Sequence, residues 1–164
     1  MFNYIILTPN MEVKLIEPIS RKLNNLGRIY LNQLTKQLEP LGISRYYYAL
    51  AYICYHDGEL TQKALASALG KDKSLIVNII DTLSEQGFVY REINPADRRE
   101  HLLKATDKAK KAAPKIVATF ETINKSITEN IPAEELEIFN MVLKKMELNM
   151  RPFLSAENNN EIKP

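Results

Sequence analysis

The chain has 164 residues, of which 45% are hydrophobic and 26% charged, and its formal net charge is +2. This length and composition are typical of one globular domain of ~100–150 residues with extensions, and one cysteine with two histidines forms no disulfide and no metal-ligand spacing, so we expect no metal and no cofactor. The apolar runs are shorter than the ~20 residues of a membrane span and the first residues lack a signal-peptide pattern, so we expect a cytoplasmic protein without membrane contact.

The N-terminal quarter has the apolar period of a long helix. From Val13 to Leu41, large apolar residues recur every three or four positions, and Pro40 with Gly42 ends the pattern. A second helix is predicted from Ser44 to Cys54, closing at residues 56–58.

The next two predicted helices form a helix-turn-helix pattern. Thr61 can cap the first through its hydroxyl, and Gly70 follows where the end of a helix favours a positive φ. Asp72 can cap the second helix, which Gly87 ends. This second helix has one apolar stripe and a polar opposite face. The positions predicted to face inward in the two helices are Leu65, Ala66, Leu69, Ile76, Ile79, Ile80 and Leu83.

A β-hairpin is predicted directly after this pattern. Residues 88–93 have the composition of a strand, 94–97 of a turn and 101–103 of the returning strand. Arg98 and Arg99 stand at its tip, where the fold itself has no need of two adjacent cations. A hairpin beside a helix-turn-helix is where a protein would place cations that reach a DNA groove, so this segment predicts binding of duplex DNA.

The distribution of charge along the chain supports this interpretation. Residues 60–115 hold eleven Lys/Arg against seven Asp/Glu, a net charge of +4, whereas the rest holds eleven against thirteen, a net charge of −2. The half predicted to contact DNA therefore carries the positive charge. The alternative is that the lysines near and after the hairpin form only a solvated helix face. These lysines are Lys104, Lys108, Lys110, Lys111 and Lys115.

Two more helices are predicted after the hairpin. Apolar residues at helical spacing mark one between Ile116 and Ile127, and a heptad spacing after Pro132 marks another from Leu136 to Phe153. The tail from Ser155 to Pro164 has no apolar period and is expected to be disordered.

The first and last predicted helices carry more apolar surface than one small domain can cover. We interpret this surface as a homodimer interface, because a single helix-turn-helix that reads a palindromic site normally needs a second copy. Packing of these helices against one another within a monomer is the alternative. The residues predicted at the dimer interface are Ile16, Leu23, Phe139, Leu143, Met146 and Met150.

The helix-turn-helix and the hairpin together resemble the MarR family of bacterial transcription regulators. The resemblance rests on Leu60–Ala66, Asp72–Ser74, Asp81–Arg91 and Asp97–Arg99. It implies a mainly α fold with a small β-hairpin wing (α+β), in which a winged helix-turn-helix is flanked by N- and C-terminal dimerisation helices. The predicted domains are an N-terminal dimerisation helix (1–43), a DNA-binding domain (44–110), C-terminal dimerisation helices (111–154) and a disordered tail (155–164).

Three places depart from the family pattern. The recognition helix has Val77 and Asn78 where the family commonly has Thr-Arg, and Thr82 follows Asp81 where a basic residue is common. The glycine that usually follows the wing is absent from Ala105–Ala109, so the next helix can begin differently. The chain therefore lacks two cationic side chains that commonly contact DNA in this family.

The polar face of the second helix is predicted to enter the major groove. Asn78 can pair with adenine through two hydrogen bonds, and Val77 can either touch a thymine methyl or pack against the domain. Arg98 or Arg99 is expected in or along the minor groove, where narrow A·T-rich segments attract cations, and the resemblance implies that Asp97 orients Arg99 across the hairpin. The predicted DNA-binding residues are Thr61, Gln62, Lys73, Ser74, Val77, Asn78, Asp97, Arg98 and Arg99.

The resemblance also implies a small-molecule site. In this family, aromatic and often phenolic acids can bind between the DNA-reading lobe and the dimer helices and change the separation of the recognition helices. Cys54 has no neighbouring cation in sequence and is predicted to be an inert thiol, with a redox role as the alternative. Ordinary packing is the alternative for every residue of the effector site. Those residues are Arg45, Tyr46, Tyr47, Tyr48 and His56.

The sequence thus predicts a homodimeric, sequence-specific transcription regulator, a repressor that binds a pseudo-palindromic operator and is released by an aromatic effector. Its partners would be double-stranded DNA, a second copy of the chain and a small aromatic ligand. The alternative is a winged-helix module for protein contacts, which the missing Thr-Arg pair and the modest net charge would suit. An enzyme is not predicted, because the sequence has no Ser/His/Asp set, no paired carboxylates and no glycine-rich phosphate loop.

Overall fold

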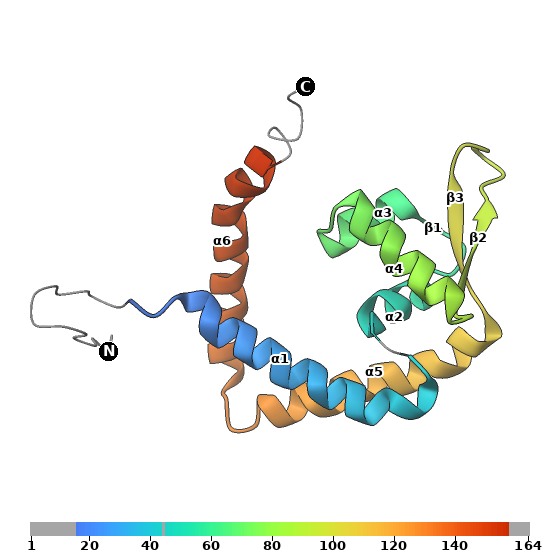
Figure 1. Cartoon of the computed structure of the whole chain (residues 1–164). Helices are drawn as coiled ribbons and strands as arrows, with labels where there is room; N and C mark the ends of the chain where they lie inside the picture. The colour runs from blue at the N-terminus through green and yellow to red at the C-terminus, as the bar shows by residue number, and fades with distance from the viewer. Residues whose placement is uncertain (1–15, 44, 158–164) are drawn as a thin grey trace, which may run out of the picture. The chain divides into compact units, whose positions relative to one another are not determined.

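The computed structural model describes residues 16–43 and 45–157 (Figure 1). The chain divides into two units, Met1–Ile123 and Asn124–Pro164. The fold is mainly helical with one small sheet, as predicted. The elements in chain order are α1 (Ile19–Leu38), η1 (Glu39–Leu41), α2 (Tyr47–Tyr55), β1 (Leu60–Thr61), α3 (Gln62–Leu69), α4 (Lys73–Glu85), β2 (Val89–Ile93), β3 (His101–Ala105), α5 (Asp107–Ile127) and α6 (Ala133–Glu157).

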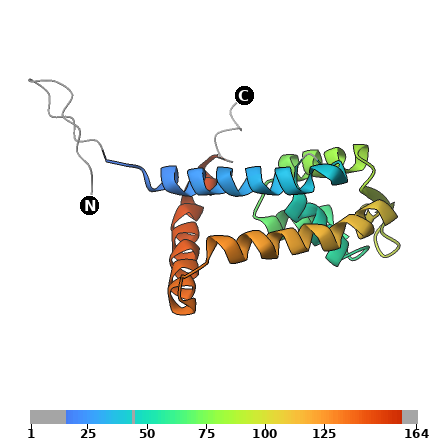
Figure 2. The same ribbon diagram turned by 90° about the horizontal axis from the view of Figure 1, so that it is seen from below.

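One hydrophobic core holds the first unit together. α1 contributes Leu34 and Leu38 from its C-terminal half, and α5 contributes Ile116 and Ile123. In this unit α1 and α5 extend away from the wing in the same direction (Figure 2). Large side chains that are fully buried in α2, α3, α4 and the segment that follows are Leu50, Ile53, Leu65, Ile76, Ile80, Leu83, Phe88 and Leu103. The winged part therefore shares one core with the C-terminal half of α1 and with most of the length of α5.

The caps predicted for the helix-turn-helix are present. The Thr61 hydroxyl accepts a hydrogen bond from the backbone N–H of Ala64 at 3.1 Å and starts α3. The Asp72 carboxylate accepts from the N–H of Leu75 at 2.8 Å and starts α4. Gly70, between the two helices, has φ +59°, a conformation that costs other residues energy. These local signals confirm the predicted boundaries.

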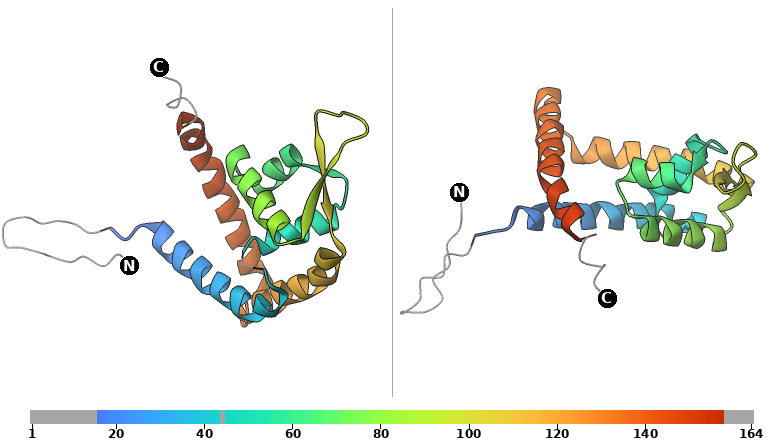
Figure 3. Two further views of the ribbon diagram at one scale, coloured as in Figure 1. Left: turned by 45° about the vertical axis from the view of Figure 1, so that its right-hand side comes forward. Right: turned by 90° about the horizontal axis from the view of Figure 1, so that it is seen from above.

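The sheet has three strands rather than the two of the predicted hairpin. Its order is β1-β3-β2, with antiparallel pairing throughout, and Leu60 of β1 lies opposite Leu103 of β3. β3 continues to Ala105, two residues beyond the prediction, where it pairs with Val89. Figure 3 shows the β2–β3 hairpin projecting past α3 and α4, in the position of a wing.

Two predicted helix starts are wrong in detail. α1 begins at Ile19 after Pro18, so Ile16 precedes the helix, and the predicted start at Val13 lies outside the described residues. A residue before proline is driven away from helical geometry, which explains the later start. α2 begins at Tyr47 rather than at Ser44, which is itself not described, because Tyr46 adopts a left-handed conformation with φ +68°.

The second unit consists mainly of α6. The carbonyl of Pro132 accepts hydrogen bonds from the N–H groups of Glu135 and Leu136 as the helix begins. The backbone stays helical to Glu157, so the prediction of a disordered tail from Ser155 is wrong for its first three residues, and 158–164 lie outside the described residues. In the described part of the chain, no helix is long and apolar enough to cross a membrane.

Candidate nucleic-acid interface

The outer face of α4 is polar and accessible. Lys73, Ser74 and Asn78 are exposed there, whereas Val77 is half-buried and contributes to packing as well as to the surface. The Asn78 side-chain oxygen accepts a hydrogen bond from the Thr82 hydroxyl at 3.3 Å. The amide NH₂ of Asn78 is then directed to serve as a donor toward an acceptor on a base.

Asp81 is also exposed on α4, and it pairs with the hairpin. Its carboxylate accepts a hydrogen bond from the Arg91 guanidinium of β2 at 2.7 Å. Arg91 is half-buried, so the ion pair ties the middle of α4 to the base of the wing. The pair sets the position of the recognition helix relative to the hairpin, and sequence analysis had not identified it.

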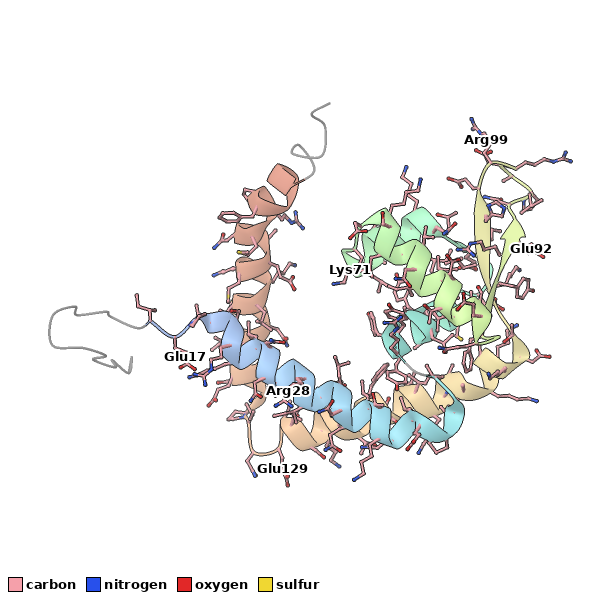
Figure 4. All side chains as sticks on the ribbon, in the orientation of Figure 1. Glu17, Arg28, Lys71, Glu92, Arg99 and Glu129 are labelled. Carbon is pink, nitrogen blue, oxygen red and sulfur yellow. The ribbon has the colours of Figure 1, made fainter. Side chains whose placement is uncertain are left out.

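The tip of the wing presents an oriented arginine (Figure 4). Both oxygens of Asp97 accept from Arg99, one from Nε at 3.0 Å and the other from Nη2 at 2.9 Å, and the Arg99 backbone N–H donates at 3.0 Å. The adjacent guanidinium lowers the pKa of the Asp97 carboxyl. The expected contact is present, but within one turn rather than across the hairpin. Arg98 beside it is exposed.

A hollow of about 400 Å³ lies between the first turns of α3 and α4 and the end of the wing. Its lining includes four of the predicted DNA-binding residues, namely Thr61, Gln62, Lys73 and Arg99. Lys63 and His101 also line it, although the sequence pattern had not singled them out. Residues of three separate elements thus converge on one basic depression.

The base of the wing is fastened to α5. The Thr106 hydroxyl accepts from the N–H of Ala109 at 3.2 Å and so caps the start of α5. The same hydroxyl donates to the Gly87 carbonyl at 2.8 Å. The Lys108 ammonium donates to the Gln86 carbonyl at 2.7 Å and lies 4.1 Å from the centre of the Phe88 ring. These contacts join the end of α4 to the start of α5.

Asp57, at the end of α2, forms a second connection. Its carboxylate accepts from the backbone N–H of Ala105 and from the Lys110 ammonium, each at 2.8 Å. Partial burial raises the pKa of Asp57, but the hydrogen bonds from Lys110 and Ala105 outweigh it and leave the pKa below its ordinary value. The loop after α2, strand β3 and helix α5 are thereby held together.

The residues predicted for an effector site do not form one group. Tyr47 is buried and donates its hydroxyl to the Ile43 carbonyl at 3.2 Å, so it belongs to the core and the prediction for it is wrong. Arg45 lies 4.8 Å from the ring centre of the half-buried Tyr46. These two form a pair of their own.

Tyr48 and His56 instead lie on one aromatic row of α2. Their rings are connected through Tyr52, with centroids 6.2 Å and 4.6 Å apart, because the three residues are spaced four apart on the helix. Phe120 of α5 contacts the Tyr48 end of the row at 6.3 Å. The i, i+4 spacing was visible in the sequence and could have identified the row.

Cys54, which we predicted to be an inert thiol, lies on the same helix. Burial, together with the charge of Asp57, raises the pKa of the Cys54 thiol to about 11, despite the opposing charge of Lys110. A thiol with this pKa stays protonated and reacts slowly at neutral pH. Within the described residues, no three His, Cys, Asp or Glu side chains are grouped to hold a metal ion.

The residues predicted for a dimer interface lie at the surface of the chain. Ile16, Phe139 and Met150 are 65%, 46% and 57% exposed, and Leu23 is 38% exposed. Leu143 and Met146 are half-buried. The exposed apolar residues in the rest of α1 and α6 include Ile19, Leu26, Ile29, Leu31, Ile138, Met141, Val142, Leu148 and Phe153.

Comparison with known proteins gives a consistent result. Residues 41–100 match the family model described as MarR family. The chain is similar to CouR from Rhodococcus jostii RHA1, solved bound to p-coumaroyl-CoA, with 27% identity over 79% of this chain and 92% of that chain and a TM-score of 0.66.

Two solved DNA complexes share the fold. One is S. aureus MepR with DNA, 22% identical over 81% of this chain and 96% of that chain, with a TM-score of 0.72. The other is a protein from Listeria monocytogenes described as a MarR family transcriptional regulator, complexed with a 26mer DNA, 21% identical over 87% and 96% of the two chains with a TM-score of 0.76. The family match covers the helix-turn-helix and most of the hairpin, and the fold matches extend over the flanking helices, so the chain is similar to the MarR family of winged-helix regulators.

Proposed function

We propose that this protein is a homodimeric transcription regulator, acting as a repressor, that places α4 in the major groove and the wing in the minor groove of duplex DNA. The observation that carries the proposal is the Asp97–Arg99 fork, which holds a cation at the exposed tip of a hairpin beside a helix-turn-helix. A charge-assisted, two-point contact pre-orients the guanidinium and reduces the entropy lost when it enters a groove.

Base recognition would come from neutral groups. Asn78 presents its NH₂ to an acceptor in the major groove, and Ser74 and Val77 lie on the same side of α4. Lys73 and Gln62 lie beside the hollow, where they can contact phosphates. The missing Thr-Arg pair would then reduce the number of cationic contacts without removing sequence discrimination.

The proposal of a dimer rests on exposed apolar residues at both ends of the chain. Ile16 and Leu23 in the first unit and Phe139 and Met150 in the second are exposed, and large exposed apolar side chains in such number favour an interface. Two copies related by a two-fold axis would read half-sites about one helical turn, ~10 bp, apart. We therefore propose a pseudo-palindromic operator.

The most detailed part of the proposal is that a small aromatic ligand regulates DNA binding. The exposed Tyr48 and the half-buried His56 offer stacking surfaces on α2, and the similar CouR was solved with p-coumaroyl-CoA bound. Arg45 could balance the charge of an acid, although it lies with Tyr46. Release of DNA by such a ligand would define the protein as an effector-controlled repressor.

Selection of bound sites from a random DNA pool, followed by competition binding, tests the proposal. Arg99→Ala, and to a lesser degree Arg98→Ala, should weaken binding to all duplexes, whereas Asn78→Ala should reduce discrimination at one base pair by ~1–3 kcal/mol and leave binding to mixed DNA nearly unchanged. Arg21→Ala is the matched control, since Arg21 is an exposed arginine paired with Glu17 on α1.

The competing function is a winged-helix module for protein contacts. It would be favoured if both wing arginine variants kept wild-type affinity for DNA while circular dichroism showed an intact fold. It would also be favoured if selection returned no enriched sequence.

A further inference from the structure

The basic hollow beside the wing contains the one histidine on this face of the described chain. His101 begins β3 and lines the hollow with Lys63 of α3, Lys73 of α4 and the turn residues Arg99 and Glu100. Across the hairpin, its partner on β2 is the apolar Ile93. The charged and titratable side chains that share the hollow with His101 are therefore three cations and one carboxylate.

The hollow lies where a DNA backbone must pass if the proposed function is correct. The major and minor grooves of a duplex are separated by the sugar-phosphate backbone of one strand. A protein with α4 in the major groove and its wing in the adjacent minor groove therefore has that strand between the two elements. The hollow occupies this place, because its lining comes from the first turns of α3 and α4 and from the wing.

The hollow combines one histidine with two lysines, one arginine and one glutamate. Histidine is the side chain that ordinarily gains its proton between about pH 5 and 8, whereas lysine and arginine remain charged there. The Glu100 carboxylate opposes an incoming phosphate, and a protonated His101 would offset it. A nearby phosphate favours the protonated imidazole, so binding of the phosphate and uptake of the proton reinforce each other.

We infer that the hollow is a site for a backbone phosphodiester of duplex DNA and that His101 makes its occupancy proton-linked, so that the protein binds DNA more tightly as pH falls. This inference rests on the proposed DNA-binding function. The ligand is sequence-independent, which separates the role of His101 from base reading by Asn78.

The test measures affinity for a labelled duplex of mixed sequence by fluorescence anisotropy, from about pH 7.5 to about pH 5.5 at fixed ionic strength. We expect the wild-type affinity to rise about tenfold over this range, which corresponds to an average uptake of about half a proton when the duplex binds. His101→Gln should bind weakly at every pH, and His101→Lys should bind tightly at every pH, with the wild type moving from the first level to the second. The fall of log affinity with log salt concentration should be steeper for His101→Lys than for His101→Gln, by about 0.9 for each phosphate contact, because the added cation releases one more counterion from the DNA.

A cation outside the hollow supplies the matched control. Arg21 lies on α1 and pairs with Glu17, and Arg21→Gln should keep the wild-type rise in affinity as pH falls. A rise that persists in His101→Gln, or a wild-type affinity that does not change with pH, would overturn the inference while leaving DNA binding intact. Failure of the wild type to bind the duplex at any pH would instead overturn the proposed function, and circular dichroism of each variant establishes that it is folded.

Discussion

The winged segment and the helices that flank it use apolar residues in opposite ways. In α3, α4 and the sheet, Leu65, Ile80 and Leu103 are fully buried, and the large apolar side chains left exposed are Tyr90 and Ile93. In α6, no described side chain is buried, and Phe139 and Met150 lie at the surface. The first region buries its large apolar side chains within the chain, whereas the second leaves the apolar surface that we assign to the proposed dimer interface.

α1 shows both behaviours along one helix. Leu34 and Leu38 are buried in the core of the first unit, whereas Leu23 and Leu26, on the same periodic stripe, are exposed. The stripe alone indicates an apolar face but not what covers it. The helix therefore has a C-terminal half that is buried within the chain and an N-terminal half that the proposed dimer would cover.

The largest effect is expected from a substitution in the proposed dimer interface of the flanking helices. In the proposed dimer, Leu143→Glu would bury an unpaired charge, which costs several kcal/mol, so the dimer should dissociate or unfold. Sedimentation at micromolar concentration measures this directly. Lys144→Glu, at the neighbouring exposed position, is the control and should remain dimeric. A Leu143→Glu protein that stayed a dimer of unchanged stability would place the interface on another surface.

The next largest effect is expected from a substitution in the core of the winged segment. Leu65→Ala removes a fully buried side chain and should lower the free energy of unfolding by ~2–5 kcal/mol. Because this core lies within one chain, the loss should be the same at low and high protein concentration, whereas the wild-type dimer itself should gain stability with concentration. Urea unfolding at two concentrations checks both statements. Leu23→Ala, on the exposed part of α1, should show the concentration dependence instead.

A third, smaller effect concerns the connection between α2 and the wing. Asp57→Ala should cost ~1–3 kcal/mol at neutral pH, because the Ala105 N–H and the Lys110 ammonium both lose their acceptor. A carboxyl whose folded pKa is lowered stabilises the fold above its unfolded pKa and loses that contribution as pH falls through the folded pKa.

The difference between Asp57→Ala and the wild type should therefore shrink below about pH 4. Urea unfolding at neutral and acid pH measures it. Asp57→Asn keeps an oxygen for the Ala105 N–H and should lose less stability at neutral pH. A gap that stayed constant into acid would contradict the role assigned to the carboxylate.

The smallest effect is expected from a substitution that removes the hydrogen bond to Asn78 on α4. Thr82→Val keeps the branched shape but removes the hydroxyl that donates to Asn78, so discrimination at the base read by Asn78 should fall by ~0.5–1.5 kcal/mol. Competition between selected and mixed duplexes measures this loss. Thr82→Ser keeps the donor and should restore discrimination. Equal discrimination in all three proteins would show that Asn78 is not positioned by its neighbour.

Local signals predicted the winged segment well. The caps at Thr61 and Asp72 depend on residues three apart, and the stripe of α4 repeats with the helical period, so the sequence contains the information directly. β1 escaped prediction because two residues, Leu60 and Thr61, are too few to show an alternation. Tyr47 was assigned to a site because a run of tyrosines does not reveal which one is buried.

Long-range polar contacts could not be predicted. Asp57 meets Ala105 across 48 positions of the chain, and the pairing of Arg91 with Asp81 requires the hairpin to fold back against α4. The hollow is similar, since Lys63, Lys73 and His101 converge only in the folded protein. Charge composition indicated a basic region, but the position of each cation depends on tertiary structure.

Because α5 is attached to the base of the wing, a tilt of this helix would move the winged segment with it. Thr106, Lys108 and Lys110 fix its first turn to the end of α4 and to the loop after α2. At about 1.5 Å per residue, its 21 residues form a rod about 30 Å long, so a tilt of about 5° displaces one end by about 3 Å relative to the other. That displacement approaches the 3.4 Å rise of one base pair. In the proposed dimer, a rotation of this size where the two copies meet would shift α4 by nearly one base-pair step of the duplex, with the core of the winged segment left unchanged.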